Sequence, residues 1–149
     1  MTSRVVPREE LTRLLHALAE CERGAVAACR LGVERAVVRD APGPMRAILS
    51  DHERHAHSLA RLLRDLRATP GGDAPRRGAA ALADDALLAE VLASEDVARA
   101  AYEGAAARED LPAYVREVIC ANLSDEQSHR AWLDVQVASS GRATRRQRP

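Results

Sequence analysis

The 149-residue sequence has no phenylalanine and no lysine, and aromatic residues make up only 2% of it. The chain therefore has few of the side chains that strands favour, whereas its alanine, leucine and arginine favour helices. The formal net charge at pH 7 is zero, with 22 basic and 22 acidic residues. Such a balance provides no overall field to attract nucleic acid or an anionic membrane, and we expect neither as a specific partner.

Long apolar runs are also missing. No uncharged stretch is long enough to span a bilayer, and the first ten residues contain no apolar segment of signal-peptide length. The three cysteines, Cys21, Cys29 and Cys120, are an odd number without a Cys-x-x-Cys pair. We therefore interpret them as reduced core thiols in a cytoplasmic protein.

Apolar residues recur at helical spacing in four segments, which predicts an all-α fold, a four-helix bundle over residues 1–140. We expect helices at about 8–35, 45–67, 84–108 and 111–138. The prolines and glycine of residues 40–44 separate the first two, because they cannot continue a helix. Residues 141–149 are basic and nearly free of apolar side chains, which predicts a disordered tail.

Residues 69–83 contain proline and glycine without helical periodicity and are predicted to be a linker. A linker of about fifteen residues can reach roughly 50 Å, whereas a helix of about 23 residues is only about 35 Å long. The linker can therefore run the length of the bundle. We expect this long crossover to make the second and third helices parallel.

Each predicted helix carries at least one metal-ligating side chain on its apolar stripe. Glu22 interrupts the stripe of the first helix, Glu95 lies at the centre of the third, and Glu126 and His129 lie one turn apart on the fourth. These ligand residues all lie near the mid-height of the bundle if the first and fourth helices are antiparallel to the second and third. Burying such groups is costly without compensation, and inward-facing Glu-x-x-His is the ligand unit of di-metal carboxylate bundles.

The second helix offers two alternative ligand sets. His52 continues the apolar stripe and His55 lies on its flank, which favours histidine. An internal repeat, in which two glutamates stand 31 residues apart in each half of the chain, instead pairs Glu53 with Glu126. That repeat puts Ala56 where a second Glu-x-x-His would need histidine. We expect burial to follow the stripe, with Glu53 as the reserve ligand.

Two further residues fall on the inner stripes. Tyr102 is predicted to be a core aromatic residue whose hydroxyl is hydrogen-bonded. Asn122 lies one turn before Glu126 and is predicted to be a hydrogen-bond partner of the site.

This layout resembles the ferritin-like superfamily. More narrowly, the segments 94–102 and 111–116, together with the Glu/His turn at 126–129, are similar to an uncharacterised family of bacterial ferritin-like bundles classed as a domain of unknown function. The resemblance covers about residues 9–138. It implies a ferritin-like four-helix bundle and a di-iron site, but no known reaction.

The function we expect is metal binding, with iron, alone or as a di-iron pair, ahead of manganese or zinc. The glutamates would bind or bridge, the histidines would complete the site, and the reaction would be ferroxidase-like oxidation of ferrous iron by oxygen or peroxide. The candidate ligands are Glu22, His52, His55, Glu95, Glu126 and His129, with Glu53 in reserve.

The alternative is a metal-free bundle that acts as an interaction or stress-related module. In that case Glu95 and Glu126 would pair with His52, His129 or Arg99 in a buried polar network. In either case a small homo-oligomer is expected, because alanine-rich helices have faces suited to close contact.

Overall fold

The computed structural model describes residues 5–38, 42–69 and 82–146, with only the backbone described from 140 onward. Within these ranges it consists of α1 (Arg8–Glu34), α2 (Pro42–Asp65), α3 (Asp84–Ala106) and α4 (Ala113–Arg146), without a strand. The predicted all-α, four-helix architecture is confirmed.

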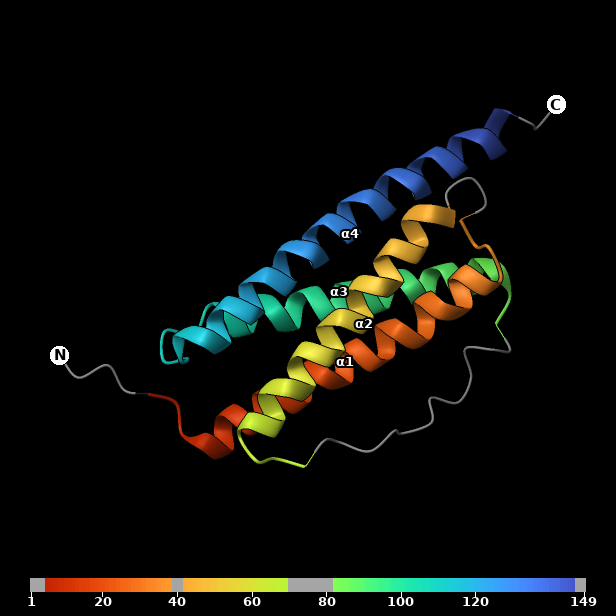
Figure 1. The fold of residues 1–149 in the computed structure, drawn as a ribbon. Helices are drawn as coiled ribbons and strands as arrows, with labels where there is room; N and C mark the ends of the chain where they lie inside the picture. The colour runs from red at the N-terminus through yellow and green to blue at the C-terminus, as the bar shows by residue number, and fades with distance from the viewer. Residues whose placement is uncertain (1–4, 39–41, 70–81, 147–149) are drawn as a thin grey trace.

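The helices form a bundle in which neighbours are antiparallel (Figure 1). α1 packs against α2 and α3, while α4 packs against α3 and, less closely, against α2. α1 and α4 run in one direction, and α2 and α3 run in the other (Figure 1). The end of α2 and the start of α3 therefore lie at opposite ends of the bundle, as the predicted long crossover requires. Residues 70–81 of that crossover lie outside the described residues.

The helix starts follow the sequence signals closely. α3 begins at Asp84 as predicted, with two acidic residues in its first turn, where the helix dipole favours negative charge. α2 begins at Pro42, three residues before the expected start, because proline is well tolerated in the first turn of a helix. The proline-containing segment that separates the first two helices thus also contains the first residues of α2.

α4 differs most from prediction, since it continues to Arg146 and does not end before Ser139. The boundary drawn at residue 140 therefore does not mark the end of the helix, and residues 147–149 of the expected tail lie outside the described residues. Ser139 donates its hydroxyl proton to the carbonyl of Val135 at 2.8 Å, a bond compatible with helical backbone. Leu133 is the last buried side chain among those described, and α4 extends past the other helices (Figure 1).

α1 and α2 end alike. Ala36 and Arg67, two residues past each helix, have φ angles of 50° and 52°. After α2, the N–H of Ala68 donates to the carbonyl of Leu63 at 2.9 Å, and α1 is closed by the equivalent bond. This is the Schellman motif, whose left-handed residue is usually glycine.

The core is divided into two apolar clusters. The larger cluster comprises Val6, Leu11, Leu15, Leu18, Ala19, Leu59, Leu62, Leu63, Tyr102, Ala105, Leu111, Val115 and Ile119. The smaller cluster comprises Ala28, Cys29, Met45, Ile48, Val91 and Leu133. Every helix contributes residues to both clusters. Between the two clusters, at mid-height of the bundle, lies a layer of buried polar side chains, which we call the polar belt. It comprises Glu22, His52, His55, Glu95, Glu126 and His129.

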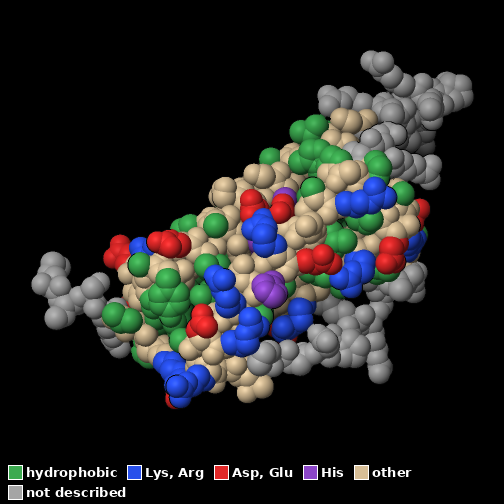
Figure 2. Space-filling view, in the orientation of Figure 1, with side chains coloured by type: hydrophobic (Ala, Val, Ile, Leu, Met, Phe, Trp, Pro, Cys, Tyr) green, Lys and Arg blue, Asp and Glu red, His purple; other side chains and the backbone are tan. Residues whose placement is uncertain are grey.

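The face of the molecule seen in Figure 2 carries charged side chains of both signs, with apolar areas between them. Among the cysteines, Cys29 is buried, Cys21 is half-buried and Cys120 is exposed. The interpretation of all three as core thiols is therefore wrong for Cys120, which follows the buried Ile119 and points away from the core. Among the described helices, none combines the length and the apolar character that crossing a membrane requires.

Candidate metal centre

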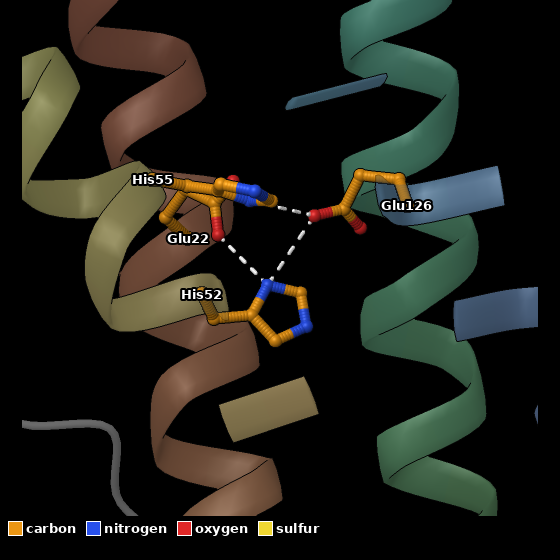
Figure 3. Close-up of side chains that lie close together, drawn as sticks. All are labelled: Glu22, His52, His55 and Glu126. Atoms are coloured by element: carbon orange, nitrogen blue, oxygen red, sulfur yellow. Dashed lines mark hydrogen bonds and ion pairs between the residues drawn. The ribbon is translucent and has the colours of Figure 1, made fainter. Parts of the chain in front are cut away.

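The polar belt contains two overlapping groups of candidate ligands. The first consists of Glu22, His52, His55 and Glu126 (Figure 3). The second consists of His52, Glu95, Glu126 and His129. In each group, one ligand atom from every residue lies within 4.8 Å of the others. Six of the seven predicted ligands thus come together, from all four helices.

His52 lies at the centre, with a carboxylate on each ring nitrogen. Its Nδ1 is 2.8 Å from Glu22 Oε2, and its Nε2 is 2.7 Å from Glu95 Oε1. Nδ1 is also 3.3 Å from Glu126 Oε1. Burial alone would lower the pKa of His52, but its hydrogen bonds with Cys29 and the two glutamates outweigh burial and raise the pKa far above its ordinary value.

His55 and His129 each turn Nδ1 into the belt. His55 Nδ1 is 3.1 Å from both Glu22 Oε1 and Glu126 Oε1, and His129 Nδ1 is 3.5 Å from Glu95 Oε2. Burial would lower the pKa of His55, but its hydrogen bonds, first of all with Glu126, raise that pKa to about 9. The pKa of His129 is raised in the same way, with Glu95 as the leading partner against burial.

Two aspartates missed by the sequence reasoning hold the outer nitrogens of these rings. His55 Nε2 is 3.1 Å from Asp125 Oδ2, and His129 Nε2 is 3.0 Å from Asp51 Oδ2. Each aspartate thus comes from the helix opposite to that of its histidine. Arg54 donates to both, at 2.7 Å to Asp51 and 2.9 Å to Asp125. Carboxylates of this kind fix the ring orientation of ligating histidines.

A signal for these aspartates was present in the sequence. Residues 51–55 and 125–129 share the pattern aspartate, ligand, two other residues, histidine. The two halves of the chain therefore correspond at a spacing of 74 residues here, so that His52 is the counterpart of Glu126 and His55 that of His129.

Glu53 lies outside both groups. Its half-exposed carboxylate accepts a hydrogen bond from Arg30 at 2.9 Å. The repeat that pairs Glu53 with Glu126 is out of register by one residue. Because a helix turns about 100° per residue, that single step moves a side chain from the belt to the surface, as the apolar stripe indicated.

Tyr102 and Asn122 support the belt as predicted. The Tyr102 hydroxyl donates to Glu22 Oε1 at 2.6 Å and accepts from Asn122 Nδ2 at 3.0 Å. Burial and the neighbouring Glu22 raise the pKa of Tyr102, which keeps the hydroxyl protonated. In the other half of the belt, Cys29 Sγ lies 3.7 Å from Glu95 Oε1. Burial raises the pKa of that thiol as well.

The carboxylates differ in their electrostatics. Burial would raise the pKa of Glu95, but the neighbouring His129 and the hydrogen bond with His52 lower it to about 2. The pKa of Glu22 is likewise lowered against burial by its two histidine partners. For Glu126 burial prevails, and its pKa is raised. These shifts favour the ionised form of Glu22 and Glu95 and the protonated form of the histidines beside them.

Three atoms of the second group have no hydrogen-bond partner, although they are buried: Glu95 Oε2, Glu126 Oε2 and His129 Nδ1. Buried polar atoms are nearly always paired, because leaving one unpaired costs free energy. All three are atoms that can ligate a metal ion. Carboxylate and imidazole ligands together accept iron, manganese or zinc. The residues of the belt therefore fit a metal site.

No protein-family model, curated protein sequence or solved structure matches the chain. The ferritin-like assignment therefore stays a resemblance of sequence pattern, and the expected homo-oligomer stays a prediction. A function for the site has to be inferred from its own atoms.

Proposed function

We propose that the protein binds two metal ions in its polar belt, with iron first among the candidates, and that it catalyses a ferroxidase-like reaction with oxygen or peroxide. The observation that carries this proposal is the set of three buried ligand atoms that form no hydrogen bond, within two overlapping groups of four. Bound iron would supply the redox chemistry, because ferrous iron can give up an electron to oxygen or peroxide.

The protein's own residues would have distinct roles. Glu22 and His55 would hold one ion, and Glu95 and His129 the other, with Glu126 shared between them. The carboxylates would offset the positive charge of the ions in a buried site. The two apolar clusters on either side would exclude water from the belt.

Access to the belt is proposed to lie between α2 and α4, the pair of neighbouring helices that packs less closely. His129 is the most exposed of the six belt residues, at 5%, and Asp51 and Asp125 next to the belt reach solvent with about a third of their side-chain surface. Figure 2 shows acidic side chains on both sides of a basic one on this face. Such carboxylates would attract metal ions to the entrance.

The metal-free network is the second candidate, and one observation favours it. His52 is hydrogen-bonded at both ring nitrogens, at 2.8 Å and 2.7 Å, which links α1, α2 and α3. A satisfied buried network can fix the register of helices. Arg99, the other expected partner, instead pairs with Glu103 and Asp96 outside the belt.

Metal content separates the two candidates. We would determine the metal content of protein purified without a polyhistidine tag, load it with ferrous iron under anaerobic conditions and measure iron per chain. We expect about two ions in the wild type and a large loss in the Glu126→Ala/His129→Ala double variant. The matched control is Glu53→Ala/His57→Ala, which removes the same residue types from exposed positions of α2.

Three results would change the conclusion. About one zinc ion per chain, with no iron taken up, would indicate a mononuclear or structural site. Equal iron in the wild type and the belt variant would mean that iron binds elsewhere. No metal even after reconstitution would overturn the proposal and leave the hydrogen-bonded network as the role of the belt.

A further inference from the structure

We infer that His52 bridges the two metal positions, with one ion on each of its ring nitrogens. This inference rests on the proposed function, since it requires that the belt takes two ions. It assigns to His52 a role beyond that of the other histidines, each of which turns a single nitrogen into the belt.

The placement of the ring carries the inference. His52 belongs to both ligand groups. Its Nδ1 lies on the side of the first group, 2.8 Å from Glu22 Oε2, and its Nε2 lies on the side of the second, 2.7 Å from Glu95 Oε1. The ring is fully buried and therefore stands between the two glutamates that would each hold one ion.

Glu126 is the other residue that belongs to both groups. Its Oε1 contacts His55 Nδ1 at 3.1 Å in the first group, while its Oε2 is buried without a hydrogen-bond partner. Glu126 is also the counterpart of His52 in the other half of the chain. His52 and Glu126 are thus the two residues shared by both ligand groups, one with an imidazole and the other with a carboxylate.

The charge balance agrees with a bridging imidazole. The belt holds three carboxylates, one charge short of neutralising two divalent ions. A ring bound at both nitrogens has released every ring proton to solvent, two if it starts as the imidazolium, and then carries the missing negative charge. A net charge left in a buried site would be costly.

Such a bridge sets the separation of the ions. Two metal–nitrogen bonds of about 2 Å and the width of the ring place the ions about 6 Å apart. Two-metal sites in enzymes usually have roughly 3.5–4 Å between the ions. The separation, and magnetic coupling through the ring, are therefore measurable signs of the bridge.

The test uses copper(II) as the probe. We would block the exposed Cys120 by alkylation, load the full chain with copper(II), count the copper bound and record the electron paramagnetic resonance spectrum at low temperature. The X-ray absorption edge verifies that the copper stays divalent, because the thiol of Cys29 lies at the belt and copper(I) would give no signal. For wild type we expect about two coppers per chain with an integrated signal far below two spins. For His52→Gln we expect the signal per bound copper to rise several-fold. His57→Gln, the same substitution at an exposed histidine of α2, should behave as the wild type.

Two further variants make the result decisive. Glu126→Gln removes a shared ligand and should bind less copper, but the chains that still hold two ions should keep the coupling, because the ring and not the carboxylate carries it. His52→Glu installs the residue type of the counterpart position, and X-ray absorption should then show a separation shorter by about 2 Å. Circular dichroism verifies that each variant is folded, and His52→Glu tests the bridge even if His52→Gln fails to fold.

The outcomes distinguish the bridge from the two-ion site. Two bound coppers with a full two-spin signal in the wild type would overturn the bridge and leave the proposed function intact. Coupling that is lost in Glu126→Gln and kept in His52→Gln would overturn the bridge in the same way. One copper or none in the wild type would overturn the two-ion proposal itself, and the bridge with it.

Discussion

The hydroxyl of Tyr102 connects two buried polar side chains, those of Glu22 and Asn122. It donates to Glu22 and accepts from Asn122, at 2.6 Å and 3.0 Å. Tyr102 also packs in the larger apolar cluster, so its ring and its hydroxyl stabilise the protein in different ways. Removing only the hydroxyl separates these contributions.

We expect Tyr102→Phe to lower the free energy of unfolding of the metal-free protein by about 1–3 kcal/mol, because a buried amide and a buried carboxylate each lose a hydrogen bond. Denaturant unfolding measures this change. Tyr114→Phe, at a tyrosine that is 50% exposed, is the control and should change stability by less than about 0.5 kcal/mol. Equal effects of the two substitutions would contradict the structural role given to the Tyr102 hydroxyl.

At the scale of single residues, the sequence predicted burial better than partnership. The apolar stripe identified His52 as buried, whereas Glu53, the reserve ligand that the internal repeat offered, is half-exposed. Helical periodicity was the better guide because it reports which way a side chain faces. Asp51 and Asp125 were missed since both lie at the edge of the buried face, where periodicity does not distinguish a solvated carboxylate from one that holds a histidine. Their role depends on contacts across helices, which no single stripe contains.

The ends of the helices carry backbone strain that a substitution can relieve. Arg67, two residues after α2, has a φ of 52° and an exposed side chain. Left-handed backbone costs an L-residue roughly 1–2 kcal/mol, which glycine avoids.

We therefore expect Arg67→Gly to raise the free energy of unfolding by about 0.5–1 kcal/mol, the strain relieved being partly offset by the greater freedom of glycine in the unfolded chain. Thermal unfolding would show a melting temperature higher by a few degrees. Arg64→Gly, an exposed position in the last turn of α2, should do the opposite, because glycine inside a helix costs about 1 kcal/mol. Destabilisation by both substitutions would show that Arg67 is not strained.

At the scale of elements, the helices themselves were predictable and one end was not. The starts were signalled by proline and acidic residues, and α1 ends within one residue of its expected end. The end of α4 was misplaced because two serines and a glycine were taken as a stop. Serine can hydrogen-bond within a helix, as Ser139 does, and a glycine without a following proline weakens a helix without ending it.

The belt links the stability of the whole metal-free molecule to pH. His55 has a pKa of about 9, against an ordinary value of 6.5. A raised histidine pKa means that the folded state binds the proton more tightly than the unfolded state. The stabilisation is thus complete below about pH 6.5 and is lost as pH rises through about 9. Glu95, with a pKa lowered from 4.5 to about 2, contributes above 4.5 and loses its contribution as pH falls toward 2.

We expect the free energy of unfolding of the metal-free protein to fall between pH 6.5 and 9, by on the order of 3 kcal/mol from His55 alone. Urea unfolding at pH 6, 7.5 and 9 in the presence of a chelator measures it. His57→Gln, outside the belt, should retain the same pH dependence. A stability that stays constant across this range would show that the belt histidines are neutral in the folded state.

For the whole molecule, the directions of the helices followed from the reach of the linker between the second and third helices. The convergence of the ligands at mid-height followed from counting residues along each predicted helix. The correspondence between the halves was harder to obtain, because Glu22 and Glu95 are 73 residues apart whereas His52 and Glu126 are 74 apart. The extra residue lies in the segment that connects the two helices of one half, where no helical periodicity shows its position.

The exchange of ligands between the halves has a consequence for how such a belt can vary. The α1–α2 half supplies three residues of the first group and one of the second, and the α3–α4 half supplies the remaining four places. Two identical two-helix chains associating as a dimer could form a belt of this plan, but any substitution would then occur twice. Because both halves belong to one polypeptide, residue 52 can be histidine while residue 126 remains glutamate. In a single chain, a residue in one half of the belt can therefore be substituted without the same change in the other half. The pairing of His52 with Glu126 is an example of such an asymmetry.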